Sequence, residues 1–334
     1  MGSYDPSPER LRGDIDRALR AYLAARRVET PEISELLEEL ERVVAAGGKR
    51  LRPMFCYWGY RAATGEDGDA IVRAAISFEL LHTFALIHDD IMDSSTERRG
   101  HPTSFALLGL EQALLAGDLA LVLADAALWE AGFQPGIVGR AYESYSVMQQ
   151  QVIAGQYLDV AATDAMDVPA ARRVARLKSG SYSVEGPLVV GAALAAAPEA
   201  TTAALRRFGS AAGEAFQLRD DLLGLFGDPS VTGKSADADV IDGKRNFLYA
   251  ATAERAGADD RARFVARWGA PGIDPDEIAW LRNLVESSGA RAEAERLVHE
   301  LHDAALTALG AASLPQDARA ALADLLAAAI DRVA

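Results

Sequence analysis

The stretch Phe-Glu-Leu-Leu-His-Thr-Phe-Ala-Leu-Ile-His-Asp-Asp-Ile-Met-Asp, residues 78–93, is the part of the sequence that decides the fold. Its apolar residues recur with a helical period, which predicts one continuous helix. Asp89 and Asp93 are four residues apart, so their side chains lie on one face of that helix. His82 precedes Asp89 by seven residues and shares this face two turns away. The helix therefore combines an apolar body with an acidic end.

Helical patterns with good caps recur along most of the chain. Ser7-Pro8 and Thr30-Pro31 each open a helix, and Gly47-Gly48 ends the second one. Asp274–Glu277 forms a capping box with proline at the first helical position. The alternation typical of strands is hard to find, and no internal repeat, low-complexity tract or long linker divides the chain. We therefore expect an all-α fold in which residues 1–334 form one domain, a bundle of about ten or more helices.

Charge and cysteine content narrow the possible functions. The chain carries 49 acidic and 34 basic residues, a net charge of −15, which argues against a general nucleic-acid or anionic-membrane surface. Anionic ligands are still possible, because carboxylates can hold metal ions that in turn hold phosphates. Cys56 is the single cysteine, which excludes an internal disulfide and a cysteine zinc site and fits a reducing compartment.

The sequence carries few signs of membrane targeting. Asp5, Glu9 and Arg10 stand where a signal peptide would need an apolar run. The best apolar stretch, Pro187–Ala197, is about half the roughly 20 residues of a membrane span. We expect a cytoplasmic protein without stable membrane insertion and without a nucleic-acid partner.

The acidic end of the 78–93 helix needs a positive charge from outside the helix. No lysine or arginine lies three or four residues from Asp89 or Asp93. Two carboxylates about 4 Å apart repel by about 4 kcal/mol at an effective dielectric near 20. A divalent cation would relieve this, and hard oxygen ligands suit magnesium. Arg98 and Arg99 follow with donors for phosphate oxygens. The alternative is a solvated polar stripe with helical ion pairs, for which the helix lacks the cations.

A second acidic cluster occupies a later helix. Its polar stripe lies among phenylalanines and leucines and consists of Gln217, Asp220, Asp221, Gly224 and Asp228. No cation lies three or four residues from Asp220 or Asp221. Only folding could bring this cluster to the first. Two such helices facing each other would form an acidic cavity that holds several magnesium ions and stabilises a departing diphosphate. Taken alone, a solvated helix face is the alternative.

Eight short segments occur in an order that is more specific than any one of them. They are Gly47–Pro53, Asp89–Asp93, Arg98–Gly100, Gly155–Asp159, Lys178-Ser179, Phe216–Asp221, Gly233-Lys234 and Gly243–Arg245. In this order they resemble the trans-isoprenyl diphosphate synthase (polyprenyl synthetase) family, most of all bacterial geranylgeranyl diphosphate synthases. The resemblance implies a helical bundle around a deep central apolar cavity, of the isoprenoid synthase type. It also implies a magnesium-dependent prenyltransferase with three ions per active site, which acts on prenyl diphosphates as a homodimer.

The resemblance also implies roles for individual residues. The metal ligands would be Asp89 and Asp93 for two ions and Asp220 for a third, with Asp90 and Asp221 in support. The residues that hold the allylic diphosphate would be Arg98, Lys178, Gln217, Lys234 and Lys244. The isopentenyl diphosphate site would consist of Lys49, Arg52, His82 and Arg99. Dipoles of Ser179 and Gln217 would stabilise an allylic carbocation. Without the resemblance, Lys49 and Arg52 would count as surface charge and His82 as a core histidine.

Two positions depart from the family pattern, and two others bear on product length. Gly224 stands where the family often has a third aspartate, and Ser179 replaces a more usual threonine. In this family the residues four and five before the first aspartate, here Ala85 and Phe84, help set the depth of the hydrocarbon pocket. Phe84 is either the pocket floor or ordinary core. A bulky residue below a small one resembles geranylgeranyl-type enzymes, so we expect a C20 product first and C15 farnesyl diphosphate second.

Two other functions compete with chain elongation. A class I terpene cyclase also uses an aspartate-rich helix and magnesium, but it does not need the isopentenyl diphosphate site of Lys49, Arg52 and His82. A non-catalytic partner subunit would keep the fold, but such chains usually lose residues of the first cluster. Both readings are weaker than elongation to a short all-trans prenyl diphosphate.

Overall fold

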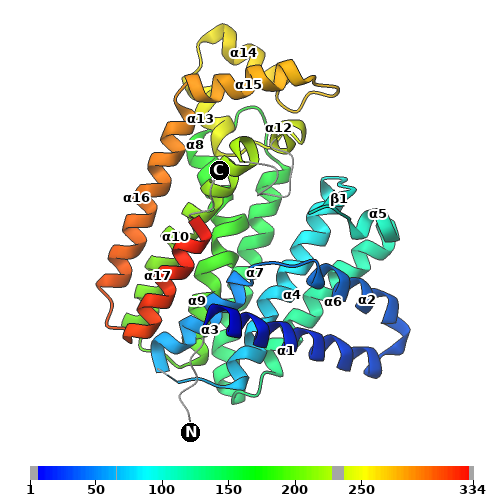
Figure 1. Ribbon diagram of the computed structural model, residues 1–334, viewed down its shortest axis with the longest axis vertical. Coiled ribbons are helices and arrows are strands. Elements are labelled where there is room, and N and C mark those ends of the chain that lie inside the picture. Colours follow the sequence, from blue (N-terminus) through cyan, green and yellow to red (C-terminus); the bar gives the residue numbers. More distant parts are fainter. Residues whose placement is uncertain (1–6, 65, 228–236, 331–334) are drawn as a thin grey trace. The chain divides into compact units, whose positions relative to one another are not determined.

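The computed structural model describes residues 7–64, 66–227 and 237–330, and helices dominate this part of the chain (Figure 1). The β-structure that it contains is a short hairpin in which β1 (Glu97–Arg98) pairs antiparallel with β2 (His101–Pro102). The predicted all-α class is thus confirmed. The hairpin coincides with the charged turn after the first aspartate cluster.

The chain divides into two compact units, each assembled from separate stretches of sequence. The first consists of residues 1–146, 186–203 and 313–322, and the second of residues 147–185, 204–312 and 323–334. The prediction that residues 1–334 form one domain is not tested by this division and stays a prediction.

The first unit contains the N-terminal helices and the first aspartate cluster. Its principal packed pairs are α4 with α6 and α3 with α9. Ser7 caps the first helix by accepting a hydrogen bond from the Arg10 amide, as the Ser7-Pro8 signal predicts. Its elements are α1 (Pro8–Glu29), η1 (Pro31–Ile33), α2 (Ser34–Ala45), α3 (Leu51–Thr64), α4 (Asp69–Met92), the hairpin, α5 (Ser104–Leu108), α6 (Leu110–Trp129), the first part of α7 (Pro135–Val160) and α9 (Gly186–Leu194).

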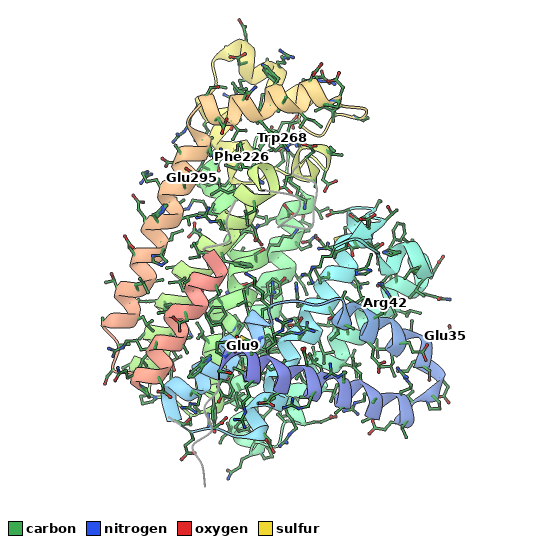
Figure 2. All side chains as sticks on the ribbon, viewed as in Figure 1. Glu9, Glu35, Arg42, Phe226, Trp268 and Glu295 are labelled. Atoms are coloured by element: carbon green, nitrogen blue, oxygen red, sulfur yellow. The ribbon has the colours of Figure 1, made fainter. Side chains whose placement is uncertain are left out.

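The second unit contains the second aspartate cluster. The Arg291 guanidinium lies 4.4 Å from the ring centre of Phe226 at the end of α10 and donates a hydrogen bond to Glu295 on its own helix. Phe226 and Glu295 are labelled in Figure 2. Asp274 caps α15 through the Glu277 amide, as predicted. Its elements are the rest of α7, α8 (Val168–Val174), η2 (Ala175–Glu185), most of α10 (Glu199–Phe226), α12 (Ala238–Ile241), α13 (Phe247–Arg255), α14 (Ala258–Arg267), α15 (Pro275–Ser287), α16 (Ala290–Gly310) and the end of α17 (Gln316–Ile330).

Two helices of the described part, α4 and α6, are long and apolar enough to cross a membrane by length and composition. The sequence expectation missed both, because it counted uninterrupted apolar residues and singled out Pro187–Ala197. The two helices pack against each other, and 61% of the apolar window of α4 is buried. Core helices of soluble proteins have the same composition, so these two give weak grounds for a membrane span.

Candidate active site

The first aspartate cluster lies at the C-terminal end of α4. The helix ends at Met92, and Asp93 is its C-cap, whose amide still donates a helical hydrogen bond to the Asp89 carbonyl oxygen. Asp89 and Asp93 therefore stand on successive turns, as the four-residue spacing predicts. Asp90 is buried, whereas Asp93 is exposed. The cluster thus contains one interior carboxylate and one that faces solvent.

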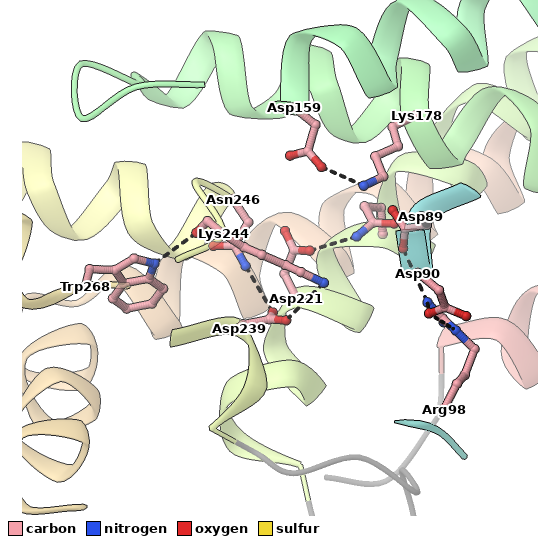
Figure 3. A network of polar contacts seen from close by, with 11 residues as sticks. Asp89, Asp90, Arg98, Asp159, Lys178, Asp221, Asp239, Lys244, Asn246 and Trp268 are labelled. Carbon is pink, nitrogen blue, oxygen red and sulfur yellow. Dashed lines mark hydrogen bonds and ion pairs between the residues drawn. The ribbon is translucent and has the colours of Figure 1, made fainter. Parts of the chain in front are cut away.

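Arg98 supplies the positive charge that the α4 helix lacks. Its Nε and Nη2 lie 2.8 and 2.7 Å from Oδ1 of Asp90, and its Nη2 lies 3.4 Å from Oδ2 of Asp89 (Figure 3). Burial lowers the pKa of Arg98, but the hydrogen bond to Asp90 and the nearby carboxylates raise it overall. The hairpin that follows α4 folds this arginine back, eight residues along the chain, onto the carboxylates.

A group of basic side chains surrounds His82 on α4. Burial lowers the pKa of His82 well below its ordinary value, and the cations Arg52, Arg99, Arg98 and Arg50 lower it further. The imidazole is therefore neutral and can donate a hydrogen bond to an anion. Lys49 is exposed and Arg52 half-buried at the start of α3. The first unit thus gathers His82, Arg52 and Arg99 of the predicted isopentenyl diphosphate site in one place.

Phe84 and Ala85, the predicted chain-length residues, are both half-buried on α4. The Phe84 ring meets His88 edge-on, with ring centres 4.7 Å apart. His88 in turn lies against α6, where a Cβ atom on Gly117 would come within 2.2 Å of its imidazole. Phe84 is thus held by a packed histidine. Its role as floor of a hydrocarbon pocket stays a prediction.

The second aspartate cluster lies at the end of α10. Asp221 is buried and accepts a hydrogen bond of 2.8 Å from the Gln217 amide, whereas Asp220 is half-buried. Burial raises the pKa of Asp221 to about 7, and the charge of Asp239 raises it as well. Asp221 is therefore a carboxyl group that holds a proton up to about pH 7, whereas Asp90 is paired with the Arg98 guanidinium.

Gly224, where the family often has aspartate, faces another carboxylate. A Cβ atom at Gly224 would lie 2.3 Å from Oδ2 of Asp239. Asp239 on α12 also accepts a hydrogen bond from the Asn246 amide at 3.3 Å, and its Oδ1 lies 3.8 Å from Nζ of Lys244 (Figure 3). Asp239 therefore fills the space beside Gly224. It also fixes Lys244, a predicted diphosphate ligand.

Lys178 lies on η2, which is a π-helix rather than the ordinary helix that sequence patterns suggest. Its Nζ contacts Oδ2 of Asp159 on α7 at 2.6 Å. A Cβ atom on Gly155 would lie 2.2 Å from the Lys178 amide nitrogen, so glycine is required for η2 to approach α7. π-helical turns are frequent at functional sites. Ser179 follows Lys178 on the same turn and is half-buried.

Several residues of this site were missed by sequence reasoning. Asp159 belonged to a recognised segment but received no role, and Asp239 and Asn246 were not considered. Trp268, whose indole nitrogen donates to the Lys244 carbonyl oxygen at 3.0 Å, carried no sequence signal. Of these four residues, only Asp159 could have been found from the ordered segments, because it lies in Gly155–Asp159.

The structure brings some predicted residues together and leaves others untested. Asp89, Asp90, Asp93, Arg98, Arg99, Lys49, Arg52 and His82 belong to the first unit, and Lys178, Ser179, Gln217, Asp220, Asp221 and Lys244 to the second. That the two clusters face each other across one cavity stays a prediction. Lys234, Gly233 and Asp228 lie outside the described residues.

The donor chemistry of both clusters fits magnesium. Within residues 7–64, 66–227 and 237–330, no three histidine, cysteine or carboxylate side chains lie close enough together to hold a metal ion by themselves. Magnesium in phosphate sites is usually held by one or two carboxylates together with substrate phosphates and water. Asp89 and Asp93 on successive turns of α4 provide such a pair of oxygen donors.

Comparison with known proteins identifies the family. A sequence profile of the polyprenyl synthetase family matches residues 33–284. The chain belongs to the polyprenyl synthetase family. It is therefore a chain-elongating prenyltransferase, as the ordered segments predict.

Individual relatives agree on the family and differ in product. Geranylfarnesyl diphosphate synthase of Aeropyrum pernix is 34% identical over 76% of this chain and 80% of its own. (2E,6E)-Farnesyl diphosphate synthase of Mycobacterium bovis is 35% identical over 86% of this chain and 80% of its own. Geranylgeranyl pyrophosphate synthase of Corynebacterium glutamicum, solved with isoprenyl diphosphate and magnesium, superposes with a TM-score of 0.92. It is 32% identical, covering 98% of this chain and 100% of its own. The fold is thus confirmed, and product length is left open.

Proposed function

We propose that this polyprenyl synthetase condenses isopentenyl diphosphate with a short allylic diphosphate and releases geranylgeranyl diphosphate, with farnesyl diphosphate as the second candidate. The observation that carries the proposal is the end of α4, where Asp89 and Asp90 meet Arg98 beside the basic group around His82. Carboxylates for metal ions and cations for phosphate oxygens lie next to each other there. Both are needed to bind two diphosphates.

Magnesium is the proposed cofactor, with three ions per active site. Asp89 and Asp93 would hold two ions and Asp220 the third, with Asp90 and Asp221 in support. Bound magnesium would neutralise the charge that develops on the departing diphosphate. The magnesium in the Corynebacterium glutamicum structure supports the choice of metal.

The chain's own residues would act on the two diphosphates in different ways. Arg98, Lys178, Gln217, Lys234 and Lys244 would hold the allylic diphosphate while its carbon–oxygen bond breaks and the diphosphate leaves. Lys49, Arg52, His82 and Arg99 would place isopentenyl diphosphate so that its double bond attacks the resulting allylic cation. The new carbon–carbon bond forms, and a proton passes to the released diphosphate. Dipoles of Ser179 and Gln217 would stabilise the cation.

The proposed bundle is one domain with a deep apolar cavity that excludes water from the cation. Such a bundle would let both aspartate clusters act on one diphosphate. Support comes from their chemistry, since magnesium in phosphate sites is usually held by one or two carboxylates together with substrate phosphates and water. A crystal structure with magnesium and an allylic diphosphate analogue should show Asp89 and Asp220 on the same diphosphate. Metal sites at only one cluster would contradict the shared cavity.

Product analysis tests the proposal directly. The purified protein is incubated with magnesium, isopentenyl diphosphate and dimethylallyl, geranyl or farnesyl diphosphate in turn, and products are identified by mass spectrometry. Geranylgeranyl diphosphate should accumulate. A hydrocarbon or alcohol from allylic diphosphate alone would instead indicate a cyclase, and absence of any longer prenyl diphosphate would indicate a non-catalytic subunit.

Phe84 provides the test of product length. Phe84→Ala removes a bulky side chain that lies about 7.5 Å before Asp89 along the axis of α4. We expect the main product to lengthen by one or more isoprene units in the same mass-spectrometric assay. An unchanged product distribution would show that Phe84 is ordinary core packing against His88.

We also propose a cytoplasmic homodimer. Large apolar side chains lie exposed along α6, namely Leu110, Leu114, Leu115, Val122 and Trp129. Contiguous apolar faces of this kind commonly mark protein interfaces. Light scattering after gel filtration should give twice the chain mass. Val122→Lys should shift it to the monomer mass, and an unchanged dimer would exclude this face.

A further inference from the structure

The loop before α3 alternates between an exposed and a buried basic residue. Lys49 is exposed, Arg50 is 6% exposed and Arg52 is half-buried. Arg50 has a positive φ of 53°, in the left-handed region that side-chain-bearing residues rarely adopt. Such a backbone persists only where the surroundings hold it in place. The left-handed residue stands between two predicted ligands of isopentenyl diphosphate.

Three groups from three different helices hold the Arg50 guanidinium. Its Nε lies 2.8 Å from Oδ1 of Asp16 on α1, and its Nη1 lies 2.5 Å from Oε1 of Glu79 on α4. Its Nη2 donates to the Val44 carbonyl oxygen at the end of α2, at 2.7 Å. Burial lowers the pKa of Arg50, but the charges of Glu79 and Asp16 raise it overall. The arginine is thus charged, paired and directed into the protein.

These contacts connect the loop to the other predicted ligands. Glu79 precedes His82 by three residues, less than one turn of α4. Arg99 donates a hydrogen bond of 3.0 Å to the Gly47 carbonyl oxygen from the other side of the loop. A Cβ atom on Gly48 would meet Nη1 of Arg50 at 3.4 Å, Oε1 of Glu79 at 3.9 Å and Nη1 of Arg99 at 4.0 Å. The loop is therefore held between α4 and the hairpin at Gly48.

We propose that Arg50 is a positioning residue for the isopentenyl diphosphate site. Paired with Glu79 and Asp16, it fixes the left-handed turn that separates Lys49 from Arg52, and the charge of Arg52 acts on His82. The inference rests on the proposed function, which assigns Lys49, Arg52 and His82 to isopentenyl diphosphate. Arg50 itself does not bind the diphosphate, because its donors already contact two carboxylates and a carbonyl group.

The geometry of its three contacts explains why residue 50 is an arginine. A lysine keeps the positive charge but offers a single nitrogen, which cannot reach α1, α2 and α4 with the fork geometry of a guanidinium. Glu79 is buried, and a buried carboxylate destabilises the fold unless a cation is paired with it. Arg50 meets that need while it sets the backbone direction of the loop.

The test separates the two substrates. KM for isopentenyl diphosphate, KM for the allylic diphosphate and kcat are measured for the wild type and Arg50→Lys. KM for isopentenyl diphosphate should rise about tenfold, since two precisely placed ligands lose their support, while KM for the allylic diphosphate should stay within about twofold. Glu79→Gln changes the partner of Arg50. It should likewise raise KM for isopentenyl diphosphate and leave KM for the allylic diphosphate nearly unchanged.

Arg61→Lys is the matched control. Arg61 lies on α3, the helix that follows the Arg50 loop, is 9% exposed and pairs with Asp317. This variant should leave both KM values within about twofold of the wild type. An equal rise in both KM values for Arg50→Lys, or the same split for Arg61→Lys, would reduce Arg50 to general support of the fold and overturn the inference.

Folding and function are checked separately. Calorimetric titration of isopentenyl diphosphate without turnover should show the same tenfold weakening for Arg50→Lys. If Arg50→Lys does not fold, the affinity for isopentenyl diphosphate is measured for Glu79→Gln and Asp16→Asn instead. Unchanged affinity in both variants would overturn the inference. Lys49→Ala tests the proposed function instead. Unchanged affinity in Lys49→Ala would remove the substrate assignment, whereas a loss there with none in Arg50→Lys and Glu79→Gln would remove only the role of Arg50.

Discussion

The two acidic helix ends have similar sequences but opposite electrostatic surroundings. At the end of α4, Asp90 and Asp89 are paired with the Arg98 guanidinium. At the end of α10, burial and the charge of Asp239 raise the pKa of Asp221 to about 7, although the hydrogen bond from the Gln217 amide lowers it. Paired aspartates alone therefore do not define a metal site. The neighbouring chain determines whether they bind protons or cations.

This difference suggests a division of labour within the proposed active site. In the first cluster, the charges of Asp89 and Asp90 are already balanced in part by the Arg98 guanidinium. The second gathers negative charge that the apoprotein relieves by protonating Asp221, and it should gain most from a bound cation. The predictions below test this contrast.

Removal of an expected metal ligand should have the largest effect. Asp89→Asn and Asp220→Asn should each lower kcat about a thousandfold or more, or about 4 kcal/mol, because each removes a charge that holds an ion on the leaving diphosphate. Steady-state kinetics at saturating magnesium measures this. Asp303→Asn, an exposed aspartate on α16, is the control and should keep wild-type activity. A loss in kcat of less than tenfold for Asp220→Asn would mean that the first cluster alone supports catalysis. The proposed difference between the two clusters would then be wrong.

The sequence predicted the helices and much of the first cluster because both depend on local spacing. Ser7, Asp274 and the four-residue step from Asp89 to Asp93 fix caps and faces through neighbours along the chain. The family resemblance added the basic residues, but their partners depend on tertiary contacts. The pairing of Arg98 with Asp90 needs the hairpin. The contact of Asp239 beside Gly224 needs α12 to approach α10, which no periodicity encodes.

The π-helix η2 was also beyond sequence reasoning. α- and π-helices share nearly the same apolar pattern over one or two turns. What distinguishes η2 is its contact with α7, which Gly155 permits at the Lys178 amide. A glycine at this position was visible in the sequence, but the element that it admits was 23 residues away. Local signals thus predict elements, whereas close contacts between elements require the folded chain.

The pH dependence of stability should distinguish the second cluster. Because the pKa of Asp221 rises from 3.8 to about 7 on folding, the folded protein holds this proton more tightly than the unfolded chain. The free energy of unfolding should therefore fall between about pH 4 and pH 7, by about 3 kcal/mol from this group. In the presence of a metal chelator, Asp221→Asn should abolish this decrease in the free energy of unfolding with rising pH. Urea unfolding at pH 5 and pH 8 measures it.

The corresponding change in the first cluster provides the control. Asp90 is paired with Arg98, so Asp90→Asn leaves a buried guanidinium with weaker partners and should destabilise the protein at both pH values. Opposite signs at pH 8, with Asp221→Asn more stable and Asp90→Asn less stable than the wild type, would confirm the contrast. The same sign in both variants would refute it.

The smallest expected effect concerns Gly224. Gly224→Ala adds only a Cβ atom, and its gain in helix propensity, up to about 1 kcal/mol, should offset the shift of Asp239. Gly224→Asp also adds a carboxylate beside Asp239 and Asp221, so it should unfold about 1–2 kcal/mol more easily than Gly224→Ala in chelator at pH 8. Millimolar magnesium should narrow this gap, because the added carboxylate restores the donor that the family often has. Equal stability of the two variants in chelator would mean that negative charge does not accumulate at the end of α10. The proposed electrostatic difference between the ends of α4 and α10 would then be refuted.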